Sequence, residues 1–304
     1  MPLKDITSVQ LRANRLILAL SLLVIAILIG FEQTRAYQRI VEQEKERLQQ
    51  SSEVVAINLG RRLQISDDIL QAILADLETL WQQPAGMPVL HHLLQSMRTS
   101  TLGIEHLLVI DAQGIVISST HSAHIGQPFE HPELLQTLRQ TQNANALHIL
   151  PPFRDAHHRW VNSLGKTRHD AQGRFQGVVL ALLNDEYFGV LIDSLRSKPD
   201  MRAGLIHDNG QVMYLTPDLE GITGQQADDV NLPFYRRHLA SDHEIDFYIG
   251  PSIAKPLRLT VTRNIRPSRG ASDHPLILAL GRDVPTLFHG WLHEVLIRFG
   301  LFLI

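Results

Sequence analysis

The chain has 304 residues, of which 44% are hydrophobic, enough to bury one large core or two moderate ones. It contains no cysteine, which excludes disulfides, thiol nucleophiles and cysteine-based metal clusters and suits an oxidising compartment. A formal net charge of -3, with acidic and basic residues interspersed, leaves no basic stripe, so we expect no nucleic-acid partner. Histidines number 16, and imidazole titrates near physiological pH.

The first predicted element is a transmembrane helix over the apolar run 16–31. Such a helix rises about 24 Å, slightly less than the roughly 30 Å hydrocarbon core, and Arg15 can reach the membrane surface. The excess of basic residues in 1–15 predicts a cytoplasmic N-terminus, with membrane lipid as a partner of the helix. The alternative is a cleaved signal peptide, for which Thr34 and Ala36 provide a weak small-x-small site.

A long stalk helix is predicted over 32–82, which is rich in Glu, Gln, Arg and Leu and low in Gly and Pro. An apolar stripe follows one face of it, formed by Tyr37, Val41, Leu48, Val55 and Leu59. We expect this stripe to pair with a second copy of the chain in a homodimer, and the residues beyond Leu63 to dock on the chain's own globular part. Pro84, Gly86 and Pro88 should end the helix, and a short helix is expected from His91 to Met97.

An internal repeat then marks a change to strands and turns. Residues 107–118 read LLVIDAQGIVIS, and residues 203–214 read AGLIHDNGQVMY. Each predicts a β-hairpin, because an apolar strand enters a polar turn with a glycine and a second strand leaves it. The turn 170–173 repeats the first one and joins predicted strands at 159–166 and 175–183. Repetition at this spacing indicates two copies of a domain rather than a solenoid.

The second copy is expected to continue with a short helix near 232–239. Three further strands are predicted at 245–248, 257–264 and 275–280. Antiparallel strands after a helix, twice over, predict the α+β class, with antiparallel sheets covered by helices on one side.

The chain is expected to close with an exit helix over 283–293 and the start of a second transmembrane helix over 295–304. Arg298 is an objection to a membrane span, and we expect it to lie near the membrane surface. The second apolar run stops abruptly, which we interpret as a fragment boundary.

This layout resembles the double PDC, or double Cache, sensor regions of bacterial transmembrane receptors, most of all those that precede diguanylate cyclase domains. The resemblance is carried by the helical segment 57–80, the paired hairpins, the strand 256–261, and the ending 278–283 before Trp291. It implies two tandem PAS-like modules after the long helix. The expected boundaries are 1–15, cytoplasmic; 16–31, first membrane helix; 32–82, stalk; 83–197, membrane-distal module; 198–284, membrane-proximal module; 285–304, exit helix and second span.

The resemblance also implies a location and a role. The chain would sit in the bacterial inner membrane, with its modules in the periplasm. A small molecule would bind the membrane-distal module and displace the helices, and a cytoplasmic output domain would respond. A histidine kinase or chemotaxis output is the alternative to a cyclase. A secreted binding protein, released by signal cleavage, and a purely structural stalk are rival interpretations of the whole chain.

The ligand pocket is expected between the first sheet and the segment 121–143. Its candidate polar residues are His121, His124, His131, Arg154, Trp160, Asn162 and Asp185. An Arg with a Trp would suit a carboxylate ligand, although Arg154 and Asp155 can equally be solvated loop residues. The tyrosine, arginine and aspartate arrangement of amino-acid-binding relatives is not evident, so an amino-acid ligand is not implied.

Histidines of this segment admit three interpretations. His121, His124, His131 and the pair at 157–158 could bind a metal ion, sense pH or be ordinary surface residues. They lie in expected loops without fixed geometry, so we predict neither metal nor cofactor. The sequence contains no Gly-x-Ser-x-Gly elbow, no His-Glu-x-x-His helix and no phosphate-binding loop, which predicts that the chain has no catalytic activity of its own.

Overall fold

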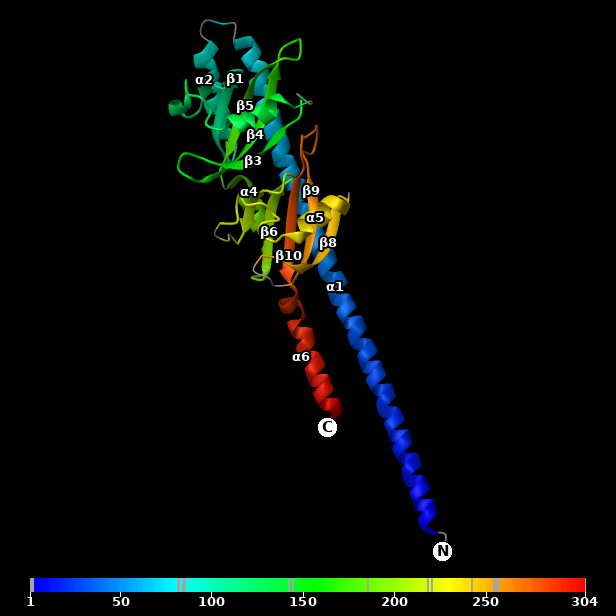
Figure 1. The fold of residues 1–304 in the computed structure, drawn as a ribbon. Helices are drawn as coiled ribbons and strands as arrows, with labels where there is room; N and C mark the ends of the chain where they lie inside the picture. The colour runs from blue at the N-terminus through cyan, green and yellow to red at the C-terminus, as the bar shows by residue number, and fades with distance from the viewer. Residues whose placement is uncertain are drawn as a thin grey trace. The chain divides into compact units, whose positions relative to one another are not determined.

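The computed structural model describes residues 3–80, 83, 86–141, 143, 145–184, 186–217, 219, 221–241, 243–253 and 257–303. Figure 1 shows the helices and strands along the chain. The chain forms two compact units, one of residues 48–284 and the other of residues 1–47 together with 285–304.

One continuous helix, α1 (Leu3–Leu80), contains the predicted membrane run and the predicted stalk as far as Leu80. The last two residues of the predicted stalk, 81 and 82, lie outside the described residues. The second helix, α2 (Gly86–Ser100), is longer at both ends than expected. Gly86 and Pro88 therefore open α2 and do not separate the helices, as a proline in the first turn loses no intrahelical hydrogen bond. Pro84 lies outside the described residues.

The first sheet has five antiparallel strands in the order β2-β1-β5-β4-β3. Their bounds are β1 (Ile104–Asp111), β2 (Val116–Ser119), β3 (His148–Arg154), β4 (Trp160–His169) and β5 (Phe175–Leu183). The predicted hairpins are present as β1–β2 and β4–β5. The sequence did not predict β3, because Pro151 and Pro152 are unusual in a strand; here the strand lies at the sheet edge, and its pairing with β4 is irregular between Leu150 and Phe153.

The first sheet is covered on both faces. On one face Leu180 packs with Leu135 and Leu138 of α3 (Pro132–Arg139). Lys166 of β4 lies opposite Val179, the neighbour of Leu180, so it points to the other face. There its Nζ lies 2.6 Å from Oδ1 of Asp67, which places α1 on the face opposite α3. The short 3-10 helix η1 (Ser122–His124) precedes α3, and α4 (Glu186–Asp193) follows β5.

The second sheet repeats the first, with strand order β7-β6-β10-β9-β8. Its elements are β6 (Met201–His207), β7 (Val212–Thr216), α5 (Pro233–Ser241), β8 (Ile245–Pro251), β9 (Leu257–Ile265) and β10 (Leu276–Asp283). Phe234 and Tyr235 of α5 pack on Ile277 and Ala279 of β10. The α+β class and the internal repeat predicted from the sequence are confirmed.

The apolar stripe of α1 is used within the chain. Leu48, Val55 and Leu59 are at most 3% exposed. Beside them, Arg263 Nε of β9 donates a hydrogen bond to Ser52 Oγ at 3.3 Å. The prediction that this stretch of the stripe pairs with a second copy of the chain is therefore wrong. The spacing of apolar residues shows that a helix face is buried, but it does not show which part of the protein covers that face. Docking on the globular part begins at Leu48 rather than beyond Leu63.

The unit formed by both chain ends pairs α1 with α6 (Val284–Leu303). Tyr37 stacks on Phe288 with ring centroids 4.5 Å apart. Nearer the end of α6, Arg298 Nη1 lies 3.4 Å from Oε2 of Glu32, the first charged residue after the apolar run of α1. The position of Arg298 relative to a membrane surface stays a prediction. Within the described residues, α1 is the one helix long and apolar enough to cross a membrane, so the second span stays a prediction.

Candidate ligand-binding site

A cavity of about 390 Å³ opens on the α3-bearing face of the first sheet; we call it the distal cavity. Leu108, Val116 and Leu182 form its floor, and the segment between β2 and α3 forms one wall. Leu108 also belongs to the hydrophobic cluster that α3 covers, so the cavity is the part of this face that α3 leaves open. The cavity lies beside the segment that the sequence suggested.

The predicted ligand-binding residues do not all line the same cavity. His121, His124 and His131 line the distal cavity. Trp160 and Asn162 instead line a different cavity of about 630 Å³, together with residues of β7.

Arg154 lies over the ring of Trp160, with its Cζ 4.8 Å from the ring centroid, and neither residue lines the distal cavity. The expected Arg–Trp pair therefore exists as a cation–π contact rather than as a wall of this cavity. Asp185 lies outside the described residues.

Sequence reasoning missed several residues of the distal cavity. They are Glu105 and His106 of β1, Phe129, Glu130, Phe153 and Arg159. A signal for His106 existed, because side chains alternate along a strand and His106 shares its face with Leu108 and Ile110, where an apolar residue would be expected.

Three histidine rings gather at one end of the cavity. The ring of His106 lies 5.1 Å from that of His121 and 5.7 Å from that of His124, and the last two are 4.8 Å apart. Burial, followed by the proximity of His121, lowers the pKa of His124. Burial also lowers the pKa of His106, against the opposing effect of Glu105. Both imidazoles are therefore neutral at pH 7.

Arg159 is held by carboxylates at the cavity mouth. Its Nη2 lies 2.8 Å from Asp155 Oδ2 and 3.7 Å from Glu105 Oε1. Burial favours the protonated form of Asp155, but hydrogen bonds from the backbone and side chain of Arg159 and from the His157 amide outweigh it and lower the pKa of Asp155. Asp155 and Arg159 are therefore both charged at neutral pH, and each satisfies the other.

The histidines do not form a ready metal site. Among the described residues, no group of three or more His, Asp or Glu side chains is arranged to hold a metal ion. This includes the predicted candidates His121, His124, His131 and His157.

The corresponding face of the second sheet is almost filled. The cavity there measures about 40 Å³. The space is occupied by Leu232, which directly precedes α5, and by Phe234 of α5, together with Ile206 and Val212. Of these two matching faces, the α3-bearing face of the first sheet is therefore the one with room for a small molecule.

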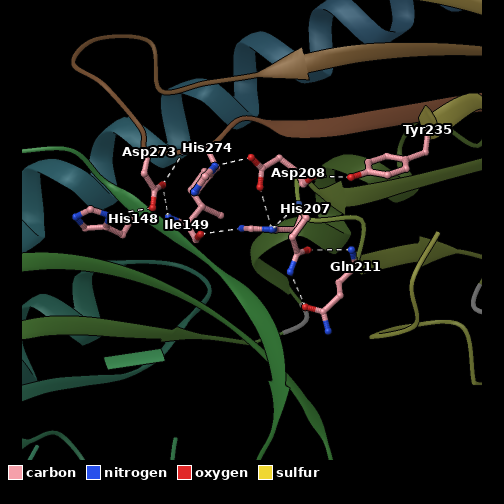
Figure 2. A network of polar contacts seen from close by, with 9 residues as sticks. His148, Ile149, His207, Asp208, Gln211, Tyr235, Asp273 and His274 are labelled. Carbon is pink, nitrogen blue, oxygen red and sulfur yellow. Dashed lines mark hydrogen bonds and ion pairs between the residues drawn. The ribbon is translucent and has the colours of Figure 1, made fainter. Parts of the chain in front are cut away.

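A network of polar contacts joins the two modules next to β3 (Figure 2). Asp273, in the loop between β9 and β10, accepts hydrogen bonds from the Ile149 amide at 3.0 Å and from His148 Nδ1 at 2.9 Å. His207 Nε2 donates to the Ile149 carbonyl at 2.9 Å. Its Nδ1 accepts a hydrogen bond from the Asn209 amide at 3.1 Å.

The same loop touches α1. The Ser268 amide donates to the Gly60 carbonyl at 3.0 Å, and the Arg269 amide donates to Gln64 Oε1 at 2.7 Å. Asp273 and these two residues belong to one loop of ten residues, 266–275, which therefore contacts the first sheet and α1 together.

Comparison with known proteins locates the fold. No protein-family model matches the chain, and no curated protein matches it. Solved structures do match. The extracellular domain of rpHK1S-Z16, a protein assigned as a histidine kinase, is 20% identical with a TM-score of 0.68, and the match covers 82% of this chain and 98% of that one.

Two chemoreceptor domains are similar in the same way. The periplasmic sensory domain of Campylobacter jejuni Tlp1 is 10% identical with a TM-score of 0.63, covering 82% of this chain and 98% of that one. The ligand-binding domain of Pseudomonas aeruginosa PctB, solved with L-Arg, is 16% identical with a TM-score of 0.62, covering 81% and 98%.

The chain therefore has the fold of extracytoplasmic sensory domains of the double Cache type, with a long N-terminal helix and two antiparallel sheets. Of these neighbours, the PctB chain is a ligand-binding domain, the Tlp1 chain a periplasmic sensory domain, and the rpHK1S-Z16 chain an extracellular domain.

Proposed function

We propose that this chain is the extracytoplasmic small-ligand sensor of a membrane receptor. The observation that carries the proposal is the distal cavity, whose volume of about 390 Å³ lies in the range of small-molecule sites. The second module offers about 40 Å³ on the matching face, so the ligand is assigned to the first. Neighbours of the same fold were solved with small molecules, L-Arg in PctB and L-leucine in Pseudomonas fluorescens CtaA.

Residues 16–31 anchor the sensor in the bacterial inner membrane, in this proposal, with the two modules in the periplasm. The distal module spans 83–197 and the proximal module 198–284. The output domain is a diguanylate cyclase, as the sequence resemblance implies, while the kinase and chemoreceptors among the neighbours supply the alternative outputs. Reading the coding sequence after the codon for Ile304 tests this: a Gly-Gly-Asp/Glu-Glu-Phe signature supports the cyclase, and a kinase or chemotaxis signalling domain refutes it.

A homodimer through the stalk helix remains part of the proposal, but on a different face. Val54, Ile57 and Ile65 are at least 50% exposed on α1, whereas Val55 and Leu59 are buried. Ile57 lies three positions and Ile65 eleven positions after Val54, spacings that fall on one helix face, which makes the three residues one apolar stripe for a second copy.

The ligand-binding proposal is tested by filling the distal cavity. Ala123 lines the cavity and is exposed, so Ala123→Trp should fill the space without disturbing the core. Ala171, in the exposed turn between β4 and β5, provides the matched control Ala171→Trp.

A metabolite library is screened by thermal shift against the soluble modules, residues 37–288, and against the same chain with each substitution. A compound that stabilises the unsubstituted protein and the Ala171→Trp control, but not Ala123→Trp, supports the proposal. If every stabilising compound acts equally on all three proteins, the distal cavity is not the ligand site.

A further inference from the structure

The fixed charges around the distal cavity do not suit an anion. Three carboxylates line it, those of Glu105, Glu130 and Asp155. Among the described residues, Arg159 alone lines the cavity with a permanent positive charge, and its guanidinium is already shared between Asp155 and Glu105. A carboxylate ligand would have to compete with both for that guanidinium and would face Glu130 as well.

Glu130 is the carboxylate that a ligand can use. Among the described residues no ion pair or hydrogen bond engages its side chain, and it lies on the wall formed by the segment between β2 and α3. The imidazoles of His106 and His124 also line the cavity, and burial lowers the pKa of both, so at neutral pH they do not oppose a cationic ligand.

An aromatic wall favours an organic cation over a metal ion. Phe129 and Phe153 meet edge to face with centroids 6.3 Å apart, and the His131 ring lies 4.2 Å from that of Phe153. Ring faces attract ammonium and guanidinium groups within about 6 Å of their centroids. The cavity is also far larger than a single ion, and its histidines are not arranged for metal coordination.

We propose that the distal cavity binds a small organic amine or guanidine, with Glu130 and Glu105 as its charge partners and Phe129 and Phe153 as its apolar wall. This inference rests on the proposed sensor function and specifies the chemistry of its ligand. It replaces the carboxylate class that Arg154 and Trp160 suggested, because neither residue lines the cavity.

Four probes of equal chain length test the charge preference directly. They are 1,4-diaminobutane, 4-aminobutanoate, succinate and 1,4-butanediol, each titrated at millimolar concentration by calorimetry and thermal shift into residues 37–288. We expect the diamine to bind most tightly and succinate to give no signal. Tighter binding of succinate, or no signal from the diamine, overturns the proposal.

Two substitutions locate the charge partner. Glu130→Gln should weaken diamine binding about tenfold, the effect of removing a charge-assisted hydrogen bond. Glu78→Gln, on the exposed face of α1, makes the same change in net charge away from the cavity and should leave binding unchanged. Equal effects of the two substitutions would refute a role for Glu130.

The affinity should also depend on pH. Lowering the pH from about 7.5 to about 5.5 adds positive charge to His106 and His124, which line the cavity and whose pKa values burial holds below 6.5. Their positive charges would add to Arg159 in the lining and Arg98 of α2 and oppose Glu105, Glu130, Asp155 and the nearby Glu133, so diamine affinity should fall about tenfold. Affinity that is unchanged or higher at the lower pH contradicts the assignment.

Failure of this inference is distinguishable from failure of the sensor proposal. A zinc-induced shift that a chelator reverses, with no response to amines, would refute the organic cation. A neutral or anionic metabolite whose effect Ala123→Trp abolishes would do the same. In both cases a ligand-binding distal cavity would stand.

Discussion

The ion pair between Lys166 and Asp67 is the point where α1 is held against the first sheet on the face opposite the cavity. Lys166 Nζ lies 2.6 Å from Asp67 Oδ1, and the two side chains are 4% and 13% exposed. Removing one partner of a buried pair leaves the other charge uncompensated, at a cost of about 3–5 kcal/mol. We therefore expect Lys166→Met to lower the free energy of unfolding by about that amount.

A double substitution separates the pair from its surroundings. Asp67→Leu with Lys166→Met removes both charges, and well-packed apolar replacements of a buried pair are often neutral or stabilising. The double variant should therefore be more stable than Lys166→Met alone. Urea denaturation of residues 37–288 measures the unfolding free energies of the unsubstituted protein, of Lys166→Met, of Asp67→Leu and of the double variant. A loss below about 1 kcal/mol for Lys166→Met, or costs of the two substitutions that simply add, would refute this account of the contact.

Three further predictions follow from other contacts. Burial lowers the pKa of His106 below the 6.5 of an unfolded histidine, so below about pH 6.5 the unfolded chain binds more protons than the folded one. The free energy of unfolding should therefore fall as the pH falls, and it should fall less steeply in His106→Asn. Urea titrations at several pH values measure both slopes. In this cysteine-free chain, Ile57→Cys should form a disulfide-linked dimer in oxidised membranes whereas buried Leu59→Cys should not; the reverse outcome contradicts the stalk interface. Gly224→Ala should lower the free energy of unfolding by about 1–3 kcal/mol, because the φ of Gly224 is 80° and a Cβ there would lie 2.1 Å from the Trp160 ring. Thermal or urea unfolding measures this loss. An unchanged stability would show that the Trp160 ring moves aside freely.

The fold was largely predictable because the sequence patterns that mark its hairpins are local and occur twice along the chain. Both hairpins of the repeat are marked by a glycine in the turn, Gly114 with φ of 90° and Gly210 with φ of 95°, a conformation that glycine adopts without strain. β3 was missed because Pro151 and Pro152 carry the opposite local signal, and only its place at the sheet edge makes them acceptable. Edge position is a property of the assembled sheet, so no local pattern could reveal it.

The sequence predicted which segment lies beside the cavity, but it did not predict all of the residues that line the cavity. His121, His124 and His131 were found because they lie in one continuous segment beside the first hairpin. Arg159 was missed and Arg154 chosen, although both flank the same turn after β3. What distinguishes them is the direction of the chain at that turn, where Asp155 caps the backbone and holds Arg159 at the cavity mouth.

Under the proposed function, a chain of contacts connects the distal cavity to α1 without crossing the first sheet. Phe153 of β3 lines the distal cavity, and Ile149 of the same strand is bonded to Asp273. The loop that carries Asp273 also bonds to Gly60 and Gln64 of α1. A ligand that favours one position of β3 thereby favours one position of this loop on α1, and a preference of about 1.4 kcal/mol is enough for a tenfold change in the ratio of two arrangements. Lys166 and Asp67 fix the same helix to the sheet from its other face, so a shift of β3 would change the loop contact while that anchor holds. Signalling by this chain would then be a movement of the loop relative to a fixed point on α1, rather than a displacement of the whole module.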